Sequence, residues 1–152
     1  MTSARANIHA TAVVVDGRGL LLTGKSGAGK TSLALTLIDM CRARQGRAFF
    51  IADDQVWLSA VRGRLVAEAP ATIAGLVELR GFGPASIANE RRAIIDGLVV
   101  LDGAHNVPRV HLQQRESLQG VTLPKLTLPF ASSSGSARAI LAWIGELDRD
   151  FT

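Results

Sequence analysis

The stretch Gly24-Lys25-Ser26-Gly27-Ala28-Gly29-Lys30-Thr31 decides the fold, because it fits the phosphate-binding loop pattern G-x-x-x-x-G-K-[ST] at every fixed position. Its glycines let consecutive backbone N–H groups turn inward around phosphate oxygens. In such loops the lysine, here Lys30, reaches the β- and γ-phosphates, and the hydroxyl of the next residue, here Thr31, can ligate Mg²⁺. The sequence therefore predicts a nucleotide or phosphate site.

The residues on either side of this loop predict the strand and the helix that the motif requires. Residues 19–23 form a short apolar run, which indicates a strand. Residues 31–41 carry apolar side chains at helical spacing, namely Leu33, Leu37, Ile38 and Cys41. The loop should therefore open a helix whose N-terminus faces the bound phosphates.

Length and composition are those of a globular chain. With 152 residues, of which 47% are hydrophobic, it is long enough for a core without disulfides, and we expect one domain over residues 1–152. The single cysteine, Cys41, falls on the apolar face of the predicted helix, so we expect a buried structural thiol. No stretch approaches the roughly 18 apolar residues of a membrane span, and the N-terminus lacks a signal-peptide pattern, so we expect a cytoplasmic protein.

The chain is basic, with a net charge of +4 and a sequence pI of about 10.2. Its basic residues are dispersed, no Lys/Arg block is interleaved with aromatic residues, and tyrosine is absent. This pattern favours a solvated surface that attracts acidic partners or phosphates. We expect neither a nucleic acid nor a membrane among its partners.

The remaining pattern predicts a mixed, strand-rich α/β domain built around the loop. Residues 8–15 are rich in β-formers, and Asp16-Gly17 is a hairpin signal before the strand at 19–23. Further strands are predicted at 48–51, 56–58, 65–67 and 98–101, with a turn at 62–64.

Near the C-terminal end the prolines and one serine give further predictions. Pro124 and Pro129 bracket residues 125–128, which are expected to form an edge strand or an extended segment because proline cannot donate to a sheet ladder. Ser136 is expected to cap a last helix. The apolar face of that helix would hold Ala137, Ile140, Leu141, Ile144 and Leu147.

A second chemical signal is the pair Asp53-Asp54, which follows the strand predicted at 48–51. A strand returning beside the loop strand would bring its carboxyl end, and these two acids, near the γ-phosphate. One carboxylate could then hold a metal ion and its water, while the other takes a proton from an attacking hydroxyl. A solvated turn after a strand uses the same residue types, so the pair alone leaves both interpretations open.

Several segments, taken together, resemble the catalytic domain of the HPr kinase/phosphorylase family in order and in spacing. Besides the loop, they are Ile8-His9, Ala52-Asp53-Asp54, Ala69-Pro70, Leu76-Val77-Glu78-Leu79-Arg80-Gly81-Phe82-Gly83 and Leu123-Pro124-Lys125-Leu126-Thr127-Leu128-Pro129. The resemblance covers nearly the whole chain. It implies that domain's mixed sheet and an enzyme, a P-loop protein-serine kinase that uses ATP and Mg²⁺. Its implied substrate is the phosphocarrier HPr or a paralogue, in the regulation of phosphotransferase-linked carbon or nitrogen metabolism, and the implied assembly is a homo-oligomer, by family habit a hexamer.

The same resemblance implies a role for each matching residue of the nucleotide and metal sites. Thr31 and Glu78 would ligate Mg²⁺, and Arg80 belongs to the signature that shapes the acceptor site. The residues implied to hold the nucleotide phosphates are Gly24, Lys25, Ser26, Gly27, Ala28, Gly29, Lys30 and Thr31.

For the chemical step the resemblance implies a small catalytic set. Lys30 would act on the phosphates, and Asp54 would accept the proton of the substrate serine, with Asp53 as its metal-facing or orienting neighbour. His9, fifteen residues before Gly24, matches the family's catalytic histidine. Arg109 is the best match to a later catalytic arginine, and Arg115 is a rival.

The chain also departs from the family pattern. It is similar to the short members that consist of the catalytic domain alone, and Ala10 follows His9 where the family has Gly. Residues 131–135 are neutral where the family has a basic loop linked to phosphorolysis, and after Pro129 no cation precedes Arg138. Phosphorolysis of phospho-HPr is therefore expected to be weaker than the kinase reaction, because holding a second anion requires positive charge or aligned N–H donors.

Two other functions remain open from the residues. The run Leu98-Val99-Val100-Leu101-Asp102 is typical of the metal-site strand of small-molecule kinases and switch NTPases, although no Asn-Lys-x-Asp motif for guanine is present. A non-catalytic nucleotide-sensing module would use the same loop without turnover.

Overall fold

The computed structural model describes residues 4–130 and 133–147, and strands outnumber helices in it. In chain order the elements are β1 (Ala6–Ile8), β2 (Thr11–Val15), β3 (Arg18–Thr23), α1 (Lys30–Ala43), β4 (Ala48–Ala52), β5 (Val56–Val61), β6 (Arg64–Glu68), β7 (Leu76–Leu79), β8 (Gly83–Ser86), β9 (Arg92–Ile95), β10 (Gly97–Asp102), the short 3₁₀ helix η1 (Ala104–Asn106), β11 (Gln114–Leu118), β12 (Val121–Pro129) and α2 (Ser133–Leu147). The prediction of a mixed, strand-rich α/β fold is confirmed.

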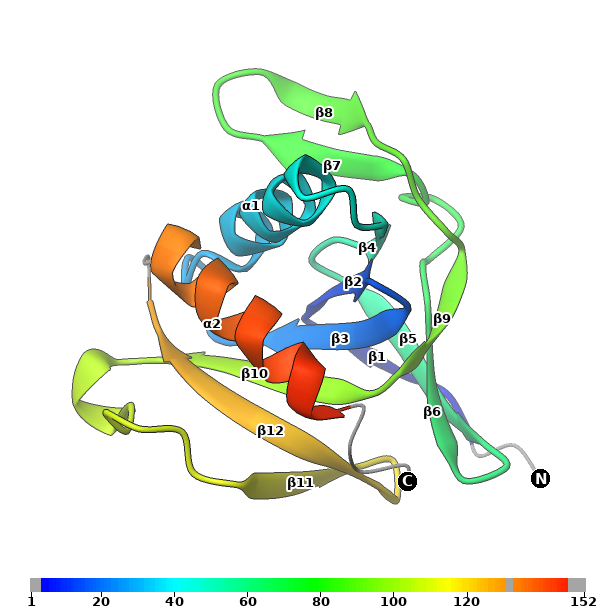
Figure 1. The fold of residues 1–152 in the computed structure, drawn as a ribbon. Coiled ribbons are helices and arrows are strands. Elements are labelled where there is room, and N and C mark those ends of the chain that lie inside the picture. The colour runs from blue at the N-terminus through cyan, green and yellow to red at the C-terminus, as the bar shows by residue number, and fades with distance from the viewer. Residues whose placement is uncertain (1–3, 131–132, 148–152) are drawn as a thin grey trace.

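A six-stranded mixed sheet with the order β11-β12-β10-β3-β2-β4 is the centre of the fold (Figure 1). β10 pairs in parallel with β3 and with β12, whereas β2 is antiparallel to both β3 and β4. The predicted hairpin is confirmed, because Asp16 and Gly17 join β2 to β3 with φ values of 48° and 78°. Two positive φ values match the right-handed twist of the flanking strands.

The predicted β-rich run at 8–15 is divided between two sheets. β1 pairs with β5 in a second, antiparallel sheet of order β1-β5-β6-β9, while β2 enters the central sheet. The chain therefore crosses between the sheets at His9 and Ala10. β4 also differs from expectation in one respect: it runs in the direction of β3, but β2 lies between them.

Close backbone contact joins the two sheets where β9 leads into β10. Asp96 N–H donates to Gly19 O at 2.7 Å, and Gly19 N–H donates to the Asp96 carboxylate at 2.9 Å. A Cβ atom at position 19 would lie 1.8 Å from the carbonyl oxygen of Ile94, so only glycine allows this approach.

Both faces of the central sheet are covered, and Figure 1 shows α1 and α2 together on one of them. Leu20 and Leu22 of β3 pack among the buried residues of the helices, whereas Leu21 between them packs among those of β5 and β6. This alternation follows from the period of two along a strand. Cys41 is fully buried on the helical side, as predicted.

The last helix differs from the prediction at its start. α2 begins at Ser133, so Ser136 lies in its first turns and does not cap it. The Ser136 side chain is buried, and its Oγ has no hydrogen-bond partner among the described residues. Leu141 is only half-buried, while Trp143 belongs to the buried stripe and lies against Gly97. The apolar sequence pattern thus located the helix but not its first residue.

The prediction that residues 125–128 form an edge strand or an extended segment agrees with the register of β12: β10 pairs with Lys125–Pro129, whereas β11 pairs with Val121–Lys125, so residues 126–128 have a strand partner on one side. Pairing with β10 extends from Lys125 to Pro129, so Pro124 lies just before that ladder and Pro129 at its last position. Pro124 pairs with Arg115 of β11 and has no partner in β10, so each proline stands where one side of β12 is unpaired and a missing N–H is tolerated.

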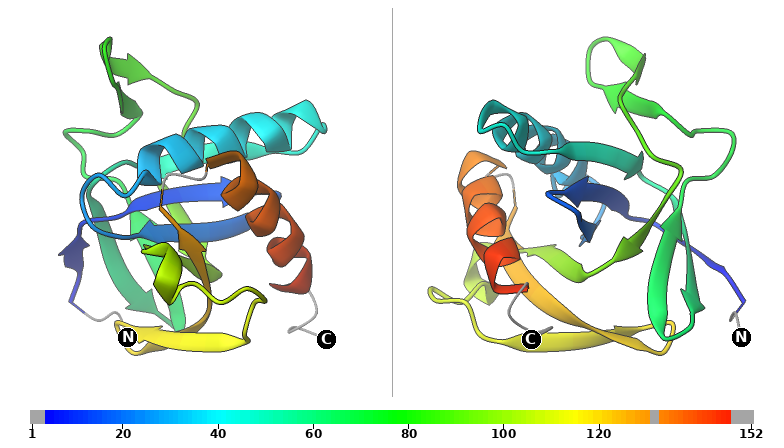
Figure 2. Two further views of the ribbon diagram at one scale, coloured as in Figure 1. Left: turned by 90° about the vertical axis from the view of Figure 1, so that its left-hand side faces the viewer. Right: turned by 45° about the vertical axis from the view of Figure 1, so that its right-hand side comes forward.

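The strands β7, β8, β9 and β11 were not predicted from the sequence. β7 and β8 pair with each other alone, and this hairpin projects from the body of the molecule above α1 in Figures 1 and 2. Within the described residues, no helix is long and apolar enough to cross a membrane.

Candidate active site

The predicted phosphate loop joins β3 to α1, as the sequence pattern requires. Gly27 and Gly29 have φ values of 82° and 97°, which glycine adopts without the strain of a side chain. Gly29 is the residue that precedes the helix, and no side chain of the described chain caps the helix there. The N–H groups of the first turn of α1 are therefore presented at the loop, where the helix dipole favours an anion.

Lys30 lies folded over its own loop. Its Nζ donates to the carbonyl oxygens of Gly24, at 2.8 Å, and Lys25, at 3.1 Å. The residue is only 6% exposed. Burial lowers the pKa of this lysine, and the nearby carboxylates of Asp54 and Asp53 act in the opposite direction by stabilising the charged form.

Asp53 is the polar centre of the buried part of the site. Its Oδ1 accepts a hydrogen bond from the Thr31 hydroxyl at 2.7 Å and another from the Thr11 hydroxyl at 3.2 Å. The residue is 8% exposed. The first turn of α1 is thus connected through one carboxylate to the end of β4 and the start of β2.

Asp54 lies in a tight turn directly after Asp53. Gln55 N–H donates to the carbonyl oxygen of Asp53 at 2.8 Å, and Asp54 between them has a φ of 69°. Such a turn with positive φ at its central residue is rare and strained, and strain of this kind gathers at functional sites. The Asp54 Oδ1 lies 3.2 Å from His9 Nδ1, and 67% of its side chain is exposed. The turn therefore presents this carboxylate to solvent beside the imidazole.

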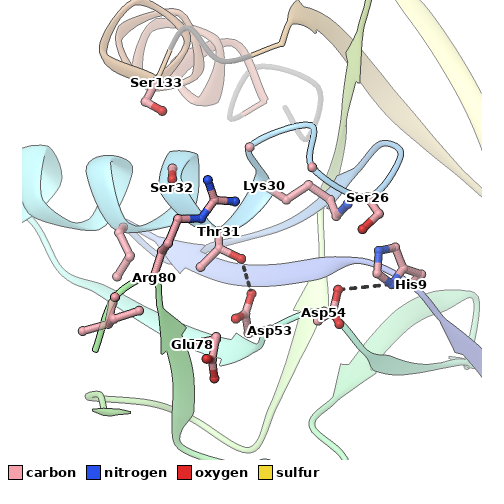
Figure 3. A pocket seen from close by; sticks show the side chains of 15 residues that line it. His9, Ser26, Lys30, Thr31, Ser32, Asp53, Asp54, Glu78, Arg80 and Ser133 are labelled. Carbon is pink, nitrogen blue, oxygen red and sulfur yellow. Dashed lines mark hydrogen bonds and ion pairs between the residues drawn. The ribbon is translucent and has the colours of Figure 1, made fainter. Parts of the chain in front are cut away.

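These side chains share one cavity of about 930 Å³, shown from close by in Figure 3. Of the sequence-predicted residues outside the loop, the cavity is lined by His9, Asp53, Asp54 and Glu78. Within the loop it is lined by Ser26, Gly27, Gly29, Lys30 and Thr31, but not by Gly24, Lys25 or Ala28. The carbonyls of Gly24 and Lys25 instead accept the Lys30 hydrogen bonds.

The β7–β8 hairpin supplies the wall of the cavity that faces the start of α1. Glu78, Leu79 and Arg80 come from β7 and from the residue after it, and Figure 3 shows the Arg80 side chain extending toward Thr31 and Ser32. Ser133, at the start of α2, lines the cavity as well. Ser133 belongs to the neutral segment 131–135, of which residues 131 and 132 lie outside the described residues.

Two predicted or rival cations are not brought to this cavity. Arg109 lines a smaller cavity of about 150 Å³ with His111 and Leu128. Arg115 lines two further cavities, on the side of β11 and β12. The catalytic role of Arg109 remains a prediction, and this structure gives it no contact with the loop.

Asp102, which kept the small-molecule kinase interpretation open, ends the strand next to β3 but does not line the cavity. A hydrogen bond from Gly103 N–H, at 2.7 Å, and another from Asn106 lower the pKa of this carboxylate, although partial desolvation acts against them. The carboxylate is thus engaged with its own following turn.

Sequence reasoning missed Thr11, Ser32 and Leu35. Ser32 and Leu35 line the cavity from the first turns of α1. Leu35 lies one helical turn after Thr31, so the position of the loop already indicates that it faces the site. Thr11 is fully buried and contacts Asp53, which lines the cavity. Its signal in the sequence is a hydroxyl residue at the start of an apolar strand, two positions after His9.

Comparisons with known proteins give one family. Residues 1–146 match the family model described as HPr Serine kinase C-terminal domain. The HPr kinase/phosphorylase of Malacoplasma penetrans is 30% identical and aligns with 92% of this chain and 48% of its own length. That of Geobacillus kaustophilus is 32% identical over 80% of this chain and 41% of its own length. The chain therefore spans less than half of the length of these relatives.

One solved structure supports the same assignment at the level of the fold. The Hpr(Ser) kinase/phosphatase from Coxiella burnetii superposes with a TM-score of 0.79 at 21% sequence identity. The match covers 94% of this chain and 99% of that one.

Proposed function

This chain belongs to the HPr serine kinase C-terminal domain family, and from that premise we propose that it transfers the γ-phosphoryl group of ATP to a serine of HPr or a paralogue. The observation that carries the proposal is the convergence of two carboxylates on one phosphate loop. Asp53 contacts the Thr31 hydroxyl at 2.7 Å, and Asp54 contacts His9 at 3.2 Å in the same cavity. ATP and HPr-type carriers are cytoplasmic, so we propose that compartment.

The loop supplies the donor side of the proposed reaction. The N–H groups at the start of α1 and the Lys30 ammonium carry the positive charge that β- and γ-phosphates require. Lys30 now donates to two loop carbonyls, so nucleotide binding would exchange these contacts for phosphate oxygens. Since transfer of a phosphoryl group depends mainly on position and charge, a preformed loop supports this role.

The residues present fit a magnesium ion. Mg²⁺ prefers oxygen ligands and is commonly held by one or two side chains together with substrate phosphates and water. The Thr31 hydroxyl and the Asp53 carboxylate both offer oxygen atoms as metal ligands, and they contact each other beside the loop. Glu78 lines the same cavity. We propose that Thr31 and Glu78 ligate the ion and that Asp53 faces it. When bound, the ion would neutralise charge on the β- and γ-phosphates.

Asp54 supplies the acceptor side. Its carboxylate would take the proton of the substrate serine hydroxyl while the serine oxygen bonds to the γ-phosphorus and the bond to the departing ADP oxygen breaks. His9, 3.2 Å from Asp54, would hold this carboxylate in place. Because the Asp54 side chain is 67% exposed, a serine on the surface of a folded protein can approach it.

The reverse reaction, phosphorolysis of phospho-HPr, is proposed to be weaker. Among the described residues that line the cavity, the lysine and arginine side chains are those of Lys30 and Arg80. Lys30 is already assigned to the donor phosphates, which leaves Arg80 to hold a second anion. The assay is pyrophosphate release from phosphate and phospho-HPr without ATP, and a reverse rate equal to the forward rate would contradict this part of the proposal.

The experiment that tests the main proposal is incubation of the chain with purified HPr and γ-labelled ATP, followed by mapping of the modified residue. We expect label on one HPr serine, dependent on Mg²⁺. Nucleotide binding without label on HPr would favour the sensing module, and label on a small metabolite would favour a small-molecule kinase. The hexamer expected from the family is a separate proposal, which the mass in solution tests.

A further inference from the structure

Two side-chain contacts extend the ladder between β2 and β4 beyond its last backbone pair. Ala12 pairs with Ala52 at the end of the ladder. One residue further along each strand, Thr11 contacts Asp53, and His9 then contacts Asp54. The segment before β2 and the turn after β4 are therefore connected twice, and the buried contact lies beneath the exposed one.

The buried contact is directional. Thr11 is 0% exposed, and a carboxylate oxygen can only accept, so the Thr11 hydroxyl donates its proton to Asp53 Oδ1 at 3.2 Å. The Thr31 hydroxyl donates to the same oxygen at 2.7 Å. Both hydroxyls thus hold Oδ1, and Oδ2 is the carboxylate oxygen that they leave for the cavity.

The surroundings of Thr11 make this hydrogen bond consequential. Thr11 is fully buried, and its neighbours Ala10 and Ala12, whose side chains point to the other face of the strand, are fully buried as well. Because the place of the Thr11 hydroxyl is fully buried, water does not readily take over its hydrogen bond when the hydroxyl is removed. Without the Thr11 hydroxyl, the orientation of Asp53 would be held by Thr31 alone, and Thr31 is itself a proposed metal ligand.

We propose that Thr11 is a positioning residue: its buried hydroxyl fixes the Asp53 carboxylate so that Oδ2 and Thr31 face the magnesium-bound phosphates of the nucleotide. The inference rests on the proposed function for the identity of the donor, ATP with Mg²⁺. It assigns to Thr11 no contact with substrate. The same hydroxyl also couples the metal side of the cavity to the strand that follows His9.

Three variants of the full chain separate the hydroxyl from the shape of the side chain. Thr11→Val keeps the shape and removes the donor, Thr11→Ser keeps the donor, and Thr127→Val makes the same change in a half-buried threonine of β12 outside the cavity. The readout is the affinity for a fluorescent ATP analogue, titrated with and without Mg²⁺, together with the melting temperature. Binding needs no protein acceptor, so this experiment does not depend on HPr phosphorylation.

Mg²⁺ should increase the affinity for the ATP analogue, and we expect Thr11→Val to raise the Mg²⁺ concentration that gives half of this increase about tenfold. Tenfold is the lower end of the range for residues that hydrogen-bond to metal ligands. Affinity without Mg²⁺ should stay within about twofold, while Thr11→Ser and Thr127→Val should behave as the parent. Equal Mg²⁺ dependence in Thr11→Val and Thr11→Ser, or a change in melting temperature alone, would overturn the inference. A parent chain that binds no nucleotide would overturn it together with the loop assignment, whereas binding without transfer to HPr would defeat only the proposed function.

Discussion

The two sides of the cavity are built differently. On the donor side, Lys30 and Asp53 are 6% and 8% exposed, and each makes two hydrogen bonds, at 2.7 to 3.2 Å, to groups of the loop, of α1 or of β2. On the acceptor side, the side chains of His9 and Asp54 are 47% and 67% exposed and make one contact with each other. The β7–β8 hairpin, which lines the same cavity, projects from the body, and Phe82 at its end is 77% exposed.

This difference fits a reaction between a small nucleotide and a large acceptor. A small anion is best held by donors that are already oriented, because little is then lost in ordering them. A folded acceptor protein must bring its serine to the carboxylate, which requires an open rim. We therefore infer that the donor side determines nucleotide binding and that the acceptor side determines the transfer step.

The largest effect is expected for Lys30→Met, which removes the donor-side charge and keeps the aliphatic stem. Turnover should fall by about 10³–10⁵, the range for loss of a cation that neutralises phosphate in phosphoryl transfer. Nucleotide affinity should fall as well, measured by titration with an ATP analogue. Normal phosphorylation of HPr by this variant would show that the loop is not the donor site.

Asp54→Asn tests the acceptor side alone and should come next. The chemical step should slow by about 10²–10⁴, the range for a general base, while nucleotide affinity stays near that of the parent. Single-turnover kinetics and equilibrium titration together separate the two quantities. If only ATP affinity falls, Asp54 belongs to the donor side and Asp53 becomes the candidate base.

Arg80→Ala should give a smaller change, because the hairpin residue contributes one charge at the rim. We expect KM for HPr to rise roughly tenfold, the size of one hydrogen bond to a charged group, with nucleotide affinity nearly unchanged. Phe82→Ala is the control on the same hairpin, in a side chain that does not line the cavity. A loss of nucleotide affinity in Arg80→Ala would place this arginine on the donor side instead.

The smallest effect is expected at Asp16, far from the cavity at the β2–β3 turn. Partial burial acts to raise the pKa of Asp16, but hydrogen bonds from Arg47 N–H, Cys41 and Arg44 outweigh it, so the pKa lies below its ordinary value. A lowered folded-state pKa stabilises the protein above the unfolded-state pKa, and the gain is lost as pH falls through the folded-state value.

Asp16→Asn should therefore lower the free energy of unfolding at pH 7 by about 1 kcal/mol or less, since 37% of the side chain is exposed. The difference from the parent should begin to shrink as the pH falls to about 4, where the carboxylate of the unfolded chain takes up a proton, and should vanish once the pH is below the lowered pKa of the folded state. Thermal unfolding between pH 3 and pH 7 measures both. A loss of nucleotide affinity at neutral pH would show that the turn is coupled to the site.

The elements that the sequence predicted correctly are those determined by residues close to one another in the chain. The loop and its helix follow from glycines and a 3.6-residue period, and the β2–β3 hairpin follows from Asp16-Gly17. The strand partners of β12, which are β11 over its first half and β10 over its second, could not be predicted, because they depend on which distant strands reach it. The prolines at 124 and 129 indicated an edge, and in the structure residues 126–128 between them pair with β10 on one side only.

The site residues also differ in whether nearby sequence or distant strands determine their position. Asp53 and Asp54 follow a strand and lie at the loop, as the parallel course of β3 and β4 requires. The contact of Thr11 with Asp53 depends on β2 lying between those strands, which no local pattern indicates. Arg109 was assigned by a loose match alone, and the structure leaves it in another cavity.

The most direct test of the division between donor and acceptor sides is the fate of the labelled γ-phosphoryl group in a single turnover with HPr. We expect nearly all label on one HPr serine in the parent, and a transfer rate lower by about 10²–10⁴ in Asp54→Asn at saturating nucleotide. Label released as inorganic phosphate at the same rate with and without HPr would contradict the account, because the exposed carboxylate would then serve water and not a protein serine.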